Sequence, residues 1–207
     1  MTRSSLLDAV QQYYAHTLEK FGPEPSGVDW NSLESQALRF KQLARLFEGQ
    51  NDFSINDYGC GYCALIPYLL DKGFRFDYFG FDICTPMIES GAGLYGKFPF
   101  CRFSSDEAQI PQADYTVASG IFNVKFDFDE GIWEQHVFDT LGKMHSVSKM
   151  GFAFNVLTSY SDAHLRRRDL YYADPLKMFA YCREHFSRFV ALLHDYPLFE
   201  FTILVRN

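Results

Sequence analysis

The sequence predicts an α/β fold of the Rossmann-like type, with a doubly wound, mostly parallel sheet and helices on both faces. From residue 53 onward, short β-rich stretches alternate with stretches of helical period. This alternation favours right-handed crossovers between parallel strands. The chain then closes with two β-rich stretches that have no helix between them. This pair predicts a hairpin and therefore one antiparallel strand.

The first 50 residues predict a helical segment that precedes the main fold. Apolar residues recur at helical spacing through 1–21, and the breaker run GPEPSG follows at 22–27. A second helix is expected to begin after Asn31 or Ser32, either of which can serve as its N-cap, and to end near Gly49. We therefore divide the chain into a helical cap (1–50) and a core (51–207).

The core is expected to contain strands and helices in alternation. The expected strands are 53–58, 74–82, 98–104, 113–124, 149–158, 188–196 and 199–207. The expected helices are 62–72, 85–96, 129–148 and 174–186. The helix over 129–148 is expected to present its apolar side chains to the core, namely Ile132, Val137, Phe138, Leu141 and Met144.

The composition narrows the partners and the compartment. A net charge of −7 gives no general electrostatic attraction for nucleic acid, and no apolar run is long enough to span a membrane. The N-terminus lacks the apolar core of a signal peptide, and the five cysteines include no second C-x-x-C pair. We therefore expect a cytoplasmic protein with a small-molecule partner, without nucleic acid or membrane, and we leave a homodimer open.

The stretch INDYGCGYCAL admits three chemistries. Residues 59–64 fit the G-x-G-x-x-G/A pattern of a dinucleotide-binding turn, and Cys60 and Cys63 form a C-x-x-C pair. Without a second pair or nearby histidines, we interpret the cysteines as incidental and predict no metal site. Asp57 decides between the cofactors, because its carboxylate opposes a pyrophosphate but suits a positively charged cofactor such as S-adenosylmethionine. Asp82, which ends the next expected strand, can accept hydrogen bonds from ribose hydroxyls.

The motifs INDYGCGYCAL, FGFDI, ADYTVASGIFNV and the ending YPLFEFTILVRN resemble those of class I S-adenosylmethionine-dependent methyltransferases. The resemblance covers about 53–207 and implies a seven-stranded sheet of order 3-2-1-4-5-7-6. It implies that the loop after the first strand faces the methionine part, that Asp82 binds the ribose, and that Ser105 and Asp106 lie near adenine. The residues it places at the cofactor are Asp57, Tyr58, Gly59, Cys60, Gly61, Asp82, Ile83, Ser105, Asp106, Ser119, Gly120 and Ile121.

Residues 26–40 also resemble a segment that precedes the core in small bacterial methyltransferases, where it commonly covers the cofactor. Trp30 and Arg39 are therefore candidate cofactor contacts. The alternative is that Trp30 only packs the segment onto the sheet, and the sequence does not decide between the two.

Candidate catalytic and acceptor-binding residues lie on the loops after the fourth and fifth expected strands. His164 is the most natural general base because its ordinary pKa lies near neutral pH, with Asn123 and Tyr160 as further candidates. The run HLRRRDLYY offers Arg166, Arg167, Arg168 and Tyr171 to a phosphate, carboxylate or nucleotide-sugar group. The alternatives are a solvated histidine and a solvated basic face.

These observations predict methyl transfer from S-adenosylmethionine to an oxygen or nitrogen of a small molecule, leaving S-adenosylhomocysteine. A sugar, a nucleotide-sugar and a secondary metabolite are all compatible acceptors. The segment 119–123 lacks the Asn/Asp-Pro-Pro-aromatic run of enzymes that methylate adenine or glutamine, so those targets are disfavoured. The alternatives are a non-catalytic Rossmann-like nucleotide- or cofactor-binding protein and an NAD-binding oxidoreductase.

Overall fold

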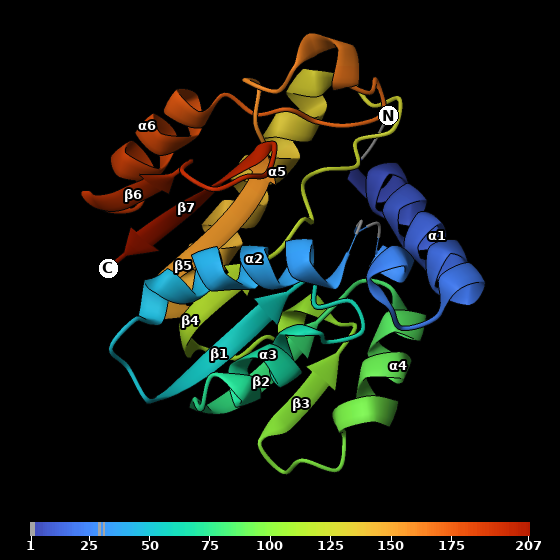
Figure 1. Cartoon of the computed structure of the whole chain (residues 1–207), viewed down its shortest axis with the longest axis vertical. Helices are drawn as coiled ribbons and strands as arrows, with labels where there is room; N and C mark the ends of the chain where they lie inside the picture. Colours follow the sequence, from blue (N-terminus) through green and yellow to red (C-terminus); the bar gives the residue numbers. More distant parts are fainter. Residues whose placement is uncertain (1–2, 29, 31) are drawn as a thin grey trace.

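A computed structural model describes residues 3–28, 30 and 32–207 (Figure 1). The α-helices are α1 (Arg3–Phe21), α2 (Leu33–Ala44), α3 (Leu65–Asp71), α4 (Thr85–Tyr95), α5 (Glu130–Ser146) and α6 (Pro175–His185). The strands are β1 (Asp52–Tyr58), β2 (Arg75–Phe81), β3 (Cys101–Ser104), β4 (Ala113–Ala118), β5 (Ser148–Leu157), β6 (Phe189–Leu193) and β7 (Glu200–Arg206). Short 3-10 turns are η1 (Pro25–Val28), η2 (Arg45–Phe47), η3 (Glu107–Gln109) and η4 (Ala163–Leu165).

The described strands form one seven-stranded sheet of order β3-β2-β1-β4-β5-β7-β6. Neighbours from β3 to β5 pair in parallel, whereas β7 runs antiparallel to both β5 and β6. The predicted fold class, strand order and closing hairpin are thereby confirmed. The carboxyl ends of the parallel strands point toward α1 (Figure 1), which is the edge where open α/β sheets bind ligands.

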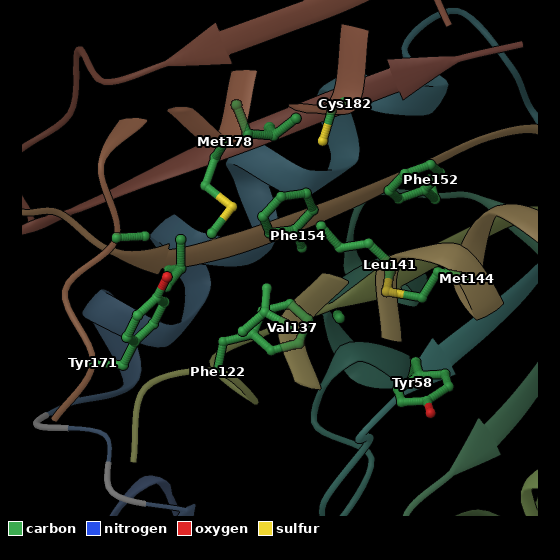
Figure 2. Close-up of a cluster of buried hydrophobic side chains, with 14 of the residues drawn as sticks. Tyr58, Phe122, Val137, Leu141, Met144, Phe152, Phe154, Tyr171, Met178 and Cys182 are labelled. Atoms are coloured by element: carbon green, nitrogen blue, oxygen red, sulfur yellow. The ribbon is translucent and has the colours of Figure 1, made fainter. Parts of the chain in front are cut away.

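Two hydrophobic cores lie on the two faces of the sheet. Helices α2 and α3 pack on one face, and α5 and α6 pack on the other. Side chains of β5 alternate accordingly, since Phe152 and Phe154 belong to the α5 core and Ala153 to the α2 core. Figure 2 shows the α5 core, where the ring of Phe122 meets Phe154 at a centroid distance of 5.8 Å.

Several predicted boundaries are wrong, two of them because the backbone turns left-handed at the site. The helix expected at 62–72 begins only at Leu65, since Gly61 and Cys63 have φ values of 53° and 67°. The strand expected at 113–124 ends at Ala118, shortly before Gly120 with a φ of 75°. The strand expected at 98–104 begins at Cys101, after a turn.

The apolar stripe predicted for α5 is also partly wrong. Ile132 is 41% exposed, and Trp133 is fully buried in its place. The indole nitrogen of Trp133 donates to the carbonyl of Phe122 at 2.9 Å, so the larger ring fills the core with its polar atom satisfied. Val137, Leu141 and Met144 are buried as predicted.

The N-terminal helices lie against the core on two sides. Helix α1 stands beyond the carboxyl ends of the strands, and α2 crosses one face of the sheet (Figure 1). Ser32 caps α2 by accepting a hydrogen bond from the amide of Ser35 at 3.1 Å. The alternative cap, Asn31, lies outside the described residues. Within the described chain, we find no helix that is both long and apolar enough to cross a bilayer.

Candidate active site

Two adjoining cavities open at the carboxyl ends of the strands. The first cavity lies among the loops after β1, β2, β3 and β4 and is closed by residues of α1, α2 and α5. The second cavity lies between the cap and the loops after β4 and β5. Tyr14, Val28, Trp30 and Gly120 line both cavities, so the two spaces meet at these residues.

Most of the predicted cofactor residues line the first cavity. They are Asp57, Tyr58, Gly59, Cys60, Gly61, Asp82, Ile83, Ser105, Ser119, Gly120, Ile121 and Trp30. Apart from Trp30, which belongs to the cap, they come from the ends of four strands and the loops that follow, which meet because parallel strands place their carboxyl ends along one edge. Asp106 and Arg39 do not line the first cavity.

The glycine-rich turn wraps closely around the end of β2. The amides of Gly59 and Cys60 donate to the carbonyl of Phe81 at 2.7 and 2.9 Å. Gly59 has a φ of 76°, and a Cβ atom at that position would meet the side chain of Ile121 at 2.2 Å. Glycine is therefore required here both for the backbone conformation and for the approach of the β4 loop.

Asp57 is the acid at the end of β1. It is 4% exposed, and the hydroxyl of Tyr78 donates to its carboxyl at 2.7 Å. Burial raises the pKa of Asp57 to about 7, the Tyr78 hydrogen bond opposes this rise, and the charge of Asp82 adds to it. A positive group in the first cavity would remove this penalty by stabilising the charged carboxylate.

Asp82 is held by two backbone amides. Gly61 and Cys84 each donate to one of its carboxyl oxygens at 2.9 Å. Burial raises the pKa of Asp82 to about 6, while these two hydrogen bonds lower it. The carboxyl is thus fixed between the glycine-rich turn and the start of α4, on the wall of the first cavity.

Glu107, which the sequence did not single out, lines the first cavity in place of Asp106. The carboxylate of Glu107 accepts hydrogen bonds from the Tyr58 hydroxyl and the Lys143 ammonium. Asp106 instead caps η3 by accepting from the amide of Ala108 at 3.0 Å. Of the two residues that the resemblance places near adenine, Ser105 lines the first cavity and Asp106 does not, whereas Glu107, the first residue of η3, does.

His136 and Thr140 of α5 also line the first cavity. The i, i+4 spacing of His136 and Thr140 places both on one face of α5, but only the packing of α5 across the sheet brings that face to the cavity. Leu7, Val10 and Tyr14 of α1 share such a face and line the same cavity.

Trp30 lies between the cap and the β4 loop. A Cβ atom on Gly120 would meet the Trp30 ring at 2.2 Å, so the ring rests directly on the Gly120 backbone. The guanidinium carbon of Arg39 lies 3.8 Å from the Trp30 ring centroid, and Arg39 Nε lies 2.8 Å from a carboxyl oxygen of the buried Glu200. Burial raises the pKa of Glu200 to about 7, and Arg39 opposes that rise.

The second cavity has a volume of about 420 Å³, within the range of small-molecule sites. Asn123, Arg167 and Arg39 are its amide and charged residues among those described. Apolar side chains from the cap and from the loops form much of the remaining wall, namely Phe21, Val28, Val124, Leu157 and Leu170.

The predicted catalytic residues are not brought together. Asn123 lines the second cavity, with its amide oxygen accepting from the amide of Leu157 at 3.2 Å. His164 lies exposed in η4, and Tyr160 is 61% exposed beside His194. Neither His164 nor Tyr160 lines either cavity, so the structure does not support their proposed catalytic roles.

The arginine run divides in the same way. All three arginines are exposed, but Arg167 lines the second cavity whereas Arg166 and Arg168 line neither. Arg166 Nε donates to the carbonyl of Ser161 at 3.2 Å. Tyr171 packs in the α5 core (Figure 2), which argues against a contact with substrate.

Cys60 and Cys63 lie close together without being bonded, their sulfur atoms 3.7 Å apart. Both are buried, and burial raises the pKa of Cys60 well above its usual range, which suppresses the reactive thiolate. No group of three or more His, Cys, Asp or Glu side chains that could hold a metal is found in the part of the chain that the structure describes.

Comparison with known proteins finds no matching family model. A curated relative, "Putative methyltransferase Rv1506c" of Mycobacterium tuberculosis, is 47% identical over 163 residues, which cover 79% of this chain and 98% of the relative. The solved "DhpI-SAM-HEP complex" superposes with a TM-score of 0.68 at 14% identity, covering 99% of this chain and 100% of that one.

The N-methyltransferase NodS of Bradyrhizobium japonicum, solved with S-adenosyl-L-homocysteine, superposes with a TM-score of 0.66 at 15% identity, covering 95% and 97%. At these identities the solved structures establish the fold, which is the one that the strand order defines. The close curated relative covers most of both chains. The chain therefore belongs to the class I S-adenosylmethionine-dependent methyltransferases.

Proposed function

We propose that the protein holds S-adenosylmethionine in the first cavity and methylates an oxygen or nitrogen atom of a small molecule in the second. The main support for this assignment is the charge of the side chains that line the first cavity. Asp57 and Asp82 stand at the ends of β1 and β2, and no Lys or Arg occurs among the described residues that line it. A cofactor with a positive charge and no phosphate fits this lining, whereas the pyrophosphate of NAD does not.

The shape of the first cavity supports the same cofactor. Gly59 and Gly61 let the backbone approach a ligand without a side chain between them, and Asp82 offers carboxyl oxygens to a pair of ribose hydroxyls. Bound there, S-adenosylmethionine supplies a methyl group activated by its sulfonium. Asp57 is placed to favour the positive charges of the cofactor, since a cation beside a buried carboxylate offsets its desolvation.

The second cavity supports a small-molecule acceptor. It meets the first cavity at Gly120 and Trp30, so an acceptor there faces the cofactor across these two residues. Displacement at the methyl carbon requires the nucleophile and the departing sulfur to stand in line, and much of the catalysis can come from that alignment. This alignment would be provided by the Trp30 ring, which rests on Gly120, and by the amide of Asn123.

The direct test is calorimetry of S-adenosylmethionine, S-adenosylhomocysteine and NAD with the wild type, Asp57→Asn and Asp77→Asn. Both adenosyl ligands should bind the wild type, and Asp57→Asn should weaken them roughly tenfold by removing one buried charge–charge contact. Asp77 lies exposed on β2, outside the cavities, so Asp77→Asn is the matched control and should bind as the wild type does. Binding of NAD but of neither adenosyl ligand would overturn the proposal.

A further inference from the structure

The geometry points to an acidic acceptor: the second cavity selects a small organic acid whose carboxylate or phosphate group is held by Arg39 and Arg167. This inference rests on the proposed function, because it takes the second cavity as the acceptor site. It goes further by naming a substrate class and two specificity residues.

Arg39 approaches the cavity from α2. The residue is 8% exposed, its Nε is bonded to Glu200, and Trp30 covers one face of the guanidinium at 3.8 Å. Its Nη1 is buried and has no hydrogen-bond partner among the described residues. A guanidinium carries five N–H donors in one plane, so the bond to Glu200 leaves donors for a second oxyanion. Glu200 and Trp30 thereby fix the plane of Arg39 beside the acceptor space.

Arg167 approaches from the loop after β5. The loop is tied to the segment after β4, because the amides of Lys125 and Phe126 donate to the carbonyl of Asp169 at 2.9 and 3.0 Å. The backbone amide of Arg167 donates to the Tyr172 hydroxyl at 3.0 Å. The side-chain Nε of Arg167 donates to the Asp169 carboxylate at 3.1 Å. Arg167 is thus oriented by its own loop while its side chain lines the cavity.

The two cavities differ in charge. Carboxylates of Asp57, Asp82 and Glu107 line the first, whereas two arginines line the second, and no Asp or Glu is among the described residues that line it. Both arginines are ion-paired, Arg39 with Glu200 and Arg167 with Asp169, so the distinction between the cavities is that guanidinium groups rather than carboxylates form the charged lining of the second. Guanidinium groups bind carboxylate and phosphate through paired hydrogen bonds, which a neutral sugar cannot match.

The rest of the wall indicates the body of the acceptor. Phe21, Leu157 and Leu170 are apolar, and the cavity volume of about 420 Å³ suits a compact molecule. An aromatic or short aliphatic acid therefore fits better than a polyhydroxylated one. Its methyl-accepting atom would face Gly120, where the two cavities meet.

The test measures the binding of benzoate, phenyl phosphate and benzamide to protein saturated with S-adenosylhomocysteine, by calorimetry at millimolar probe concentration. At least one of the two anions should bind, and the neutral benzamide should bind roughly tenfold more weakly or not at all. Comparison of benzoate with phenyl phosphate tells which oxyanion the arginines prefer.

Three variants locate the site. Arg167→Gln removes an exposed guanidinium and should weaken the anion roughly tenfold, and Arg39→Lys should do the same while retaining a charge beside Glu200. Arg168→Gln is the matched control, because Arg168 is the exposed neighbour that lines neither cavity. A melting curve for each variant checks that it is folded.

The outcomes separate this inference from the proposed function. If S-adenosylhomocysteine itself does not bind, the proposed function fails. If it binds but neither anion does, if benzamide binds as tightly as the anions, or if Arg168→Gln loses as much affinity as Arg167→Gln, the acidic acceptor is wrong and the methyltransferase assignment stands.

Discussion

At the scale of single residues, the site depends on carboxyl groups that are costly to bury. The pKa values of Asp57 and Asp82 are raised to about 7 and about 6, in each case mainly by burial. Near neutral pH, Asp57 is therefore divided between its charged and neutral forms. A cationic cofactor binds the charged form, so binding is coupled to the loss of a proton.

This coupling predicts a pH dependence of cofactor affinity. The folded pKa of Asp57 lies above its usual value, so acidification below about 7 protonates the carboxyl and removes the charge that faces the cofactor. Affinity for S-adenosylmethionine should fall about tenfold from pH 8 to pH 6. Calorimetry across this range checks the slope. Asp57→Asn should flatten it, and an unchanged slope in that variant would contradict the assignment.

The sequence identified Asp57 and Asp82 because a carboxylate that ends a parallel strand lies at the edge of the sheet where ligands bind. It missed Glu107 and His136 for physical reasons. The inward rotation of Glu107 depends on a 3-10 turn of three residues, and the position of His136 depends on how α5 packs across the sheet. Neither is encoded in a local pattern.

At the scale of elements, the loops after β1 and β4 shape the site because their glycine backbones approach neighbouring side chains closely. Gly120 has a φ of 75°, its amide donates to the buried Asn155 at 2.8 Å, and the Trp30 ring rests on it. Alternation in the sequence placed β4 correctly but extended it to residue 124, across this turn. The turn depends on contacts with Asn155 and Trp30, which lie far away in sequence.

Gly120→Ala should therefore damage the site. The added methyl group meets Trp30 and forces a left-handed conformation on alanine, which should cost roughly 1 to 3 kcal/mol of stability and at least about tenfold in cofactor affinity. Urea unfolding and calorimetry measure both. Gly142→Ala in α5 is the matched control, because its Cβ meets nothing within 4 Å and a helical alanine should stabilise the protein by about 0.5 to 1 kcal/mol. Equal effects of the two substitutions would contradict the account.

At the scale of the whole molecule, the fold was largely predictable and the acceptor site was not. Periodicity, the closing hairpin and the family resemblance were enough for a sheet of the observed order. The second cavity, proposed as the acceptor site, forms where α1, η1, α2 and two distant loops converge. Of the arginine run, only Arg167 lines it, and the sequence cannot distinguish that residue from its neighbours because all three share one loop and one charge.

The central claim is that the two cavities are the cofactor half and the acceptor half of one methyl-transfer site. A crystal structure with S-adenosylhomocysteine tests it most directly. We expect the ammonium group near Asp57, the ribose at Asp82, and the sulfur at Gly120, facing the space between Arg39 and Arg167. A sulfur atom that faces away from the second cavity, or a ligand bound outside the first, would contradict it.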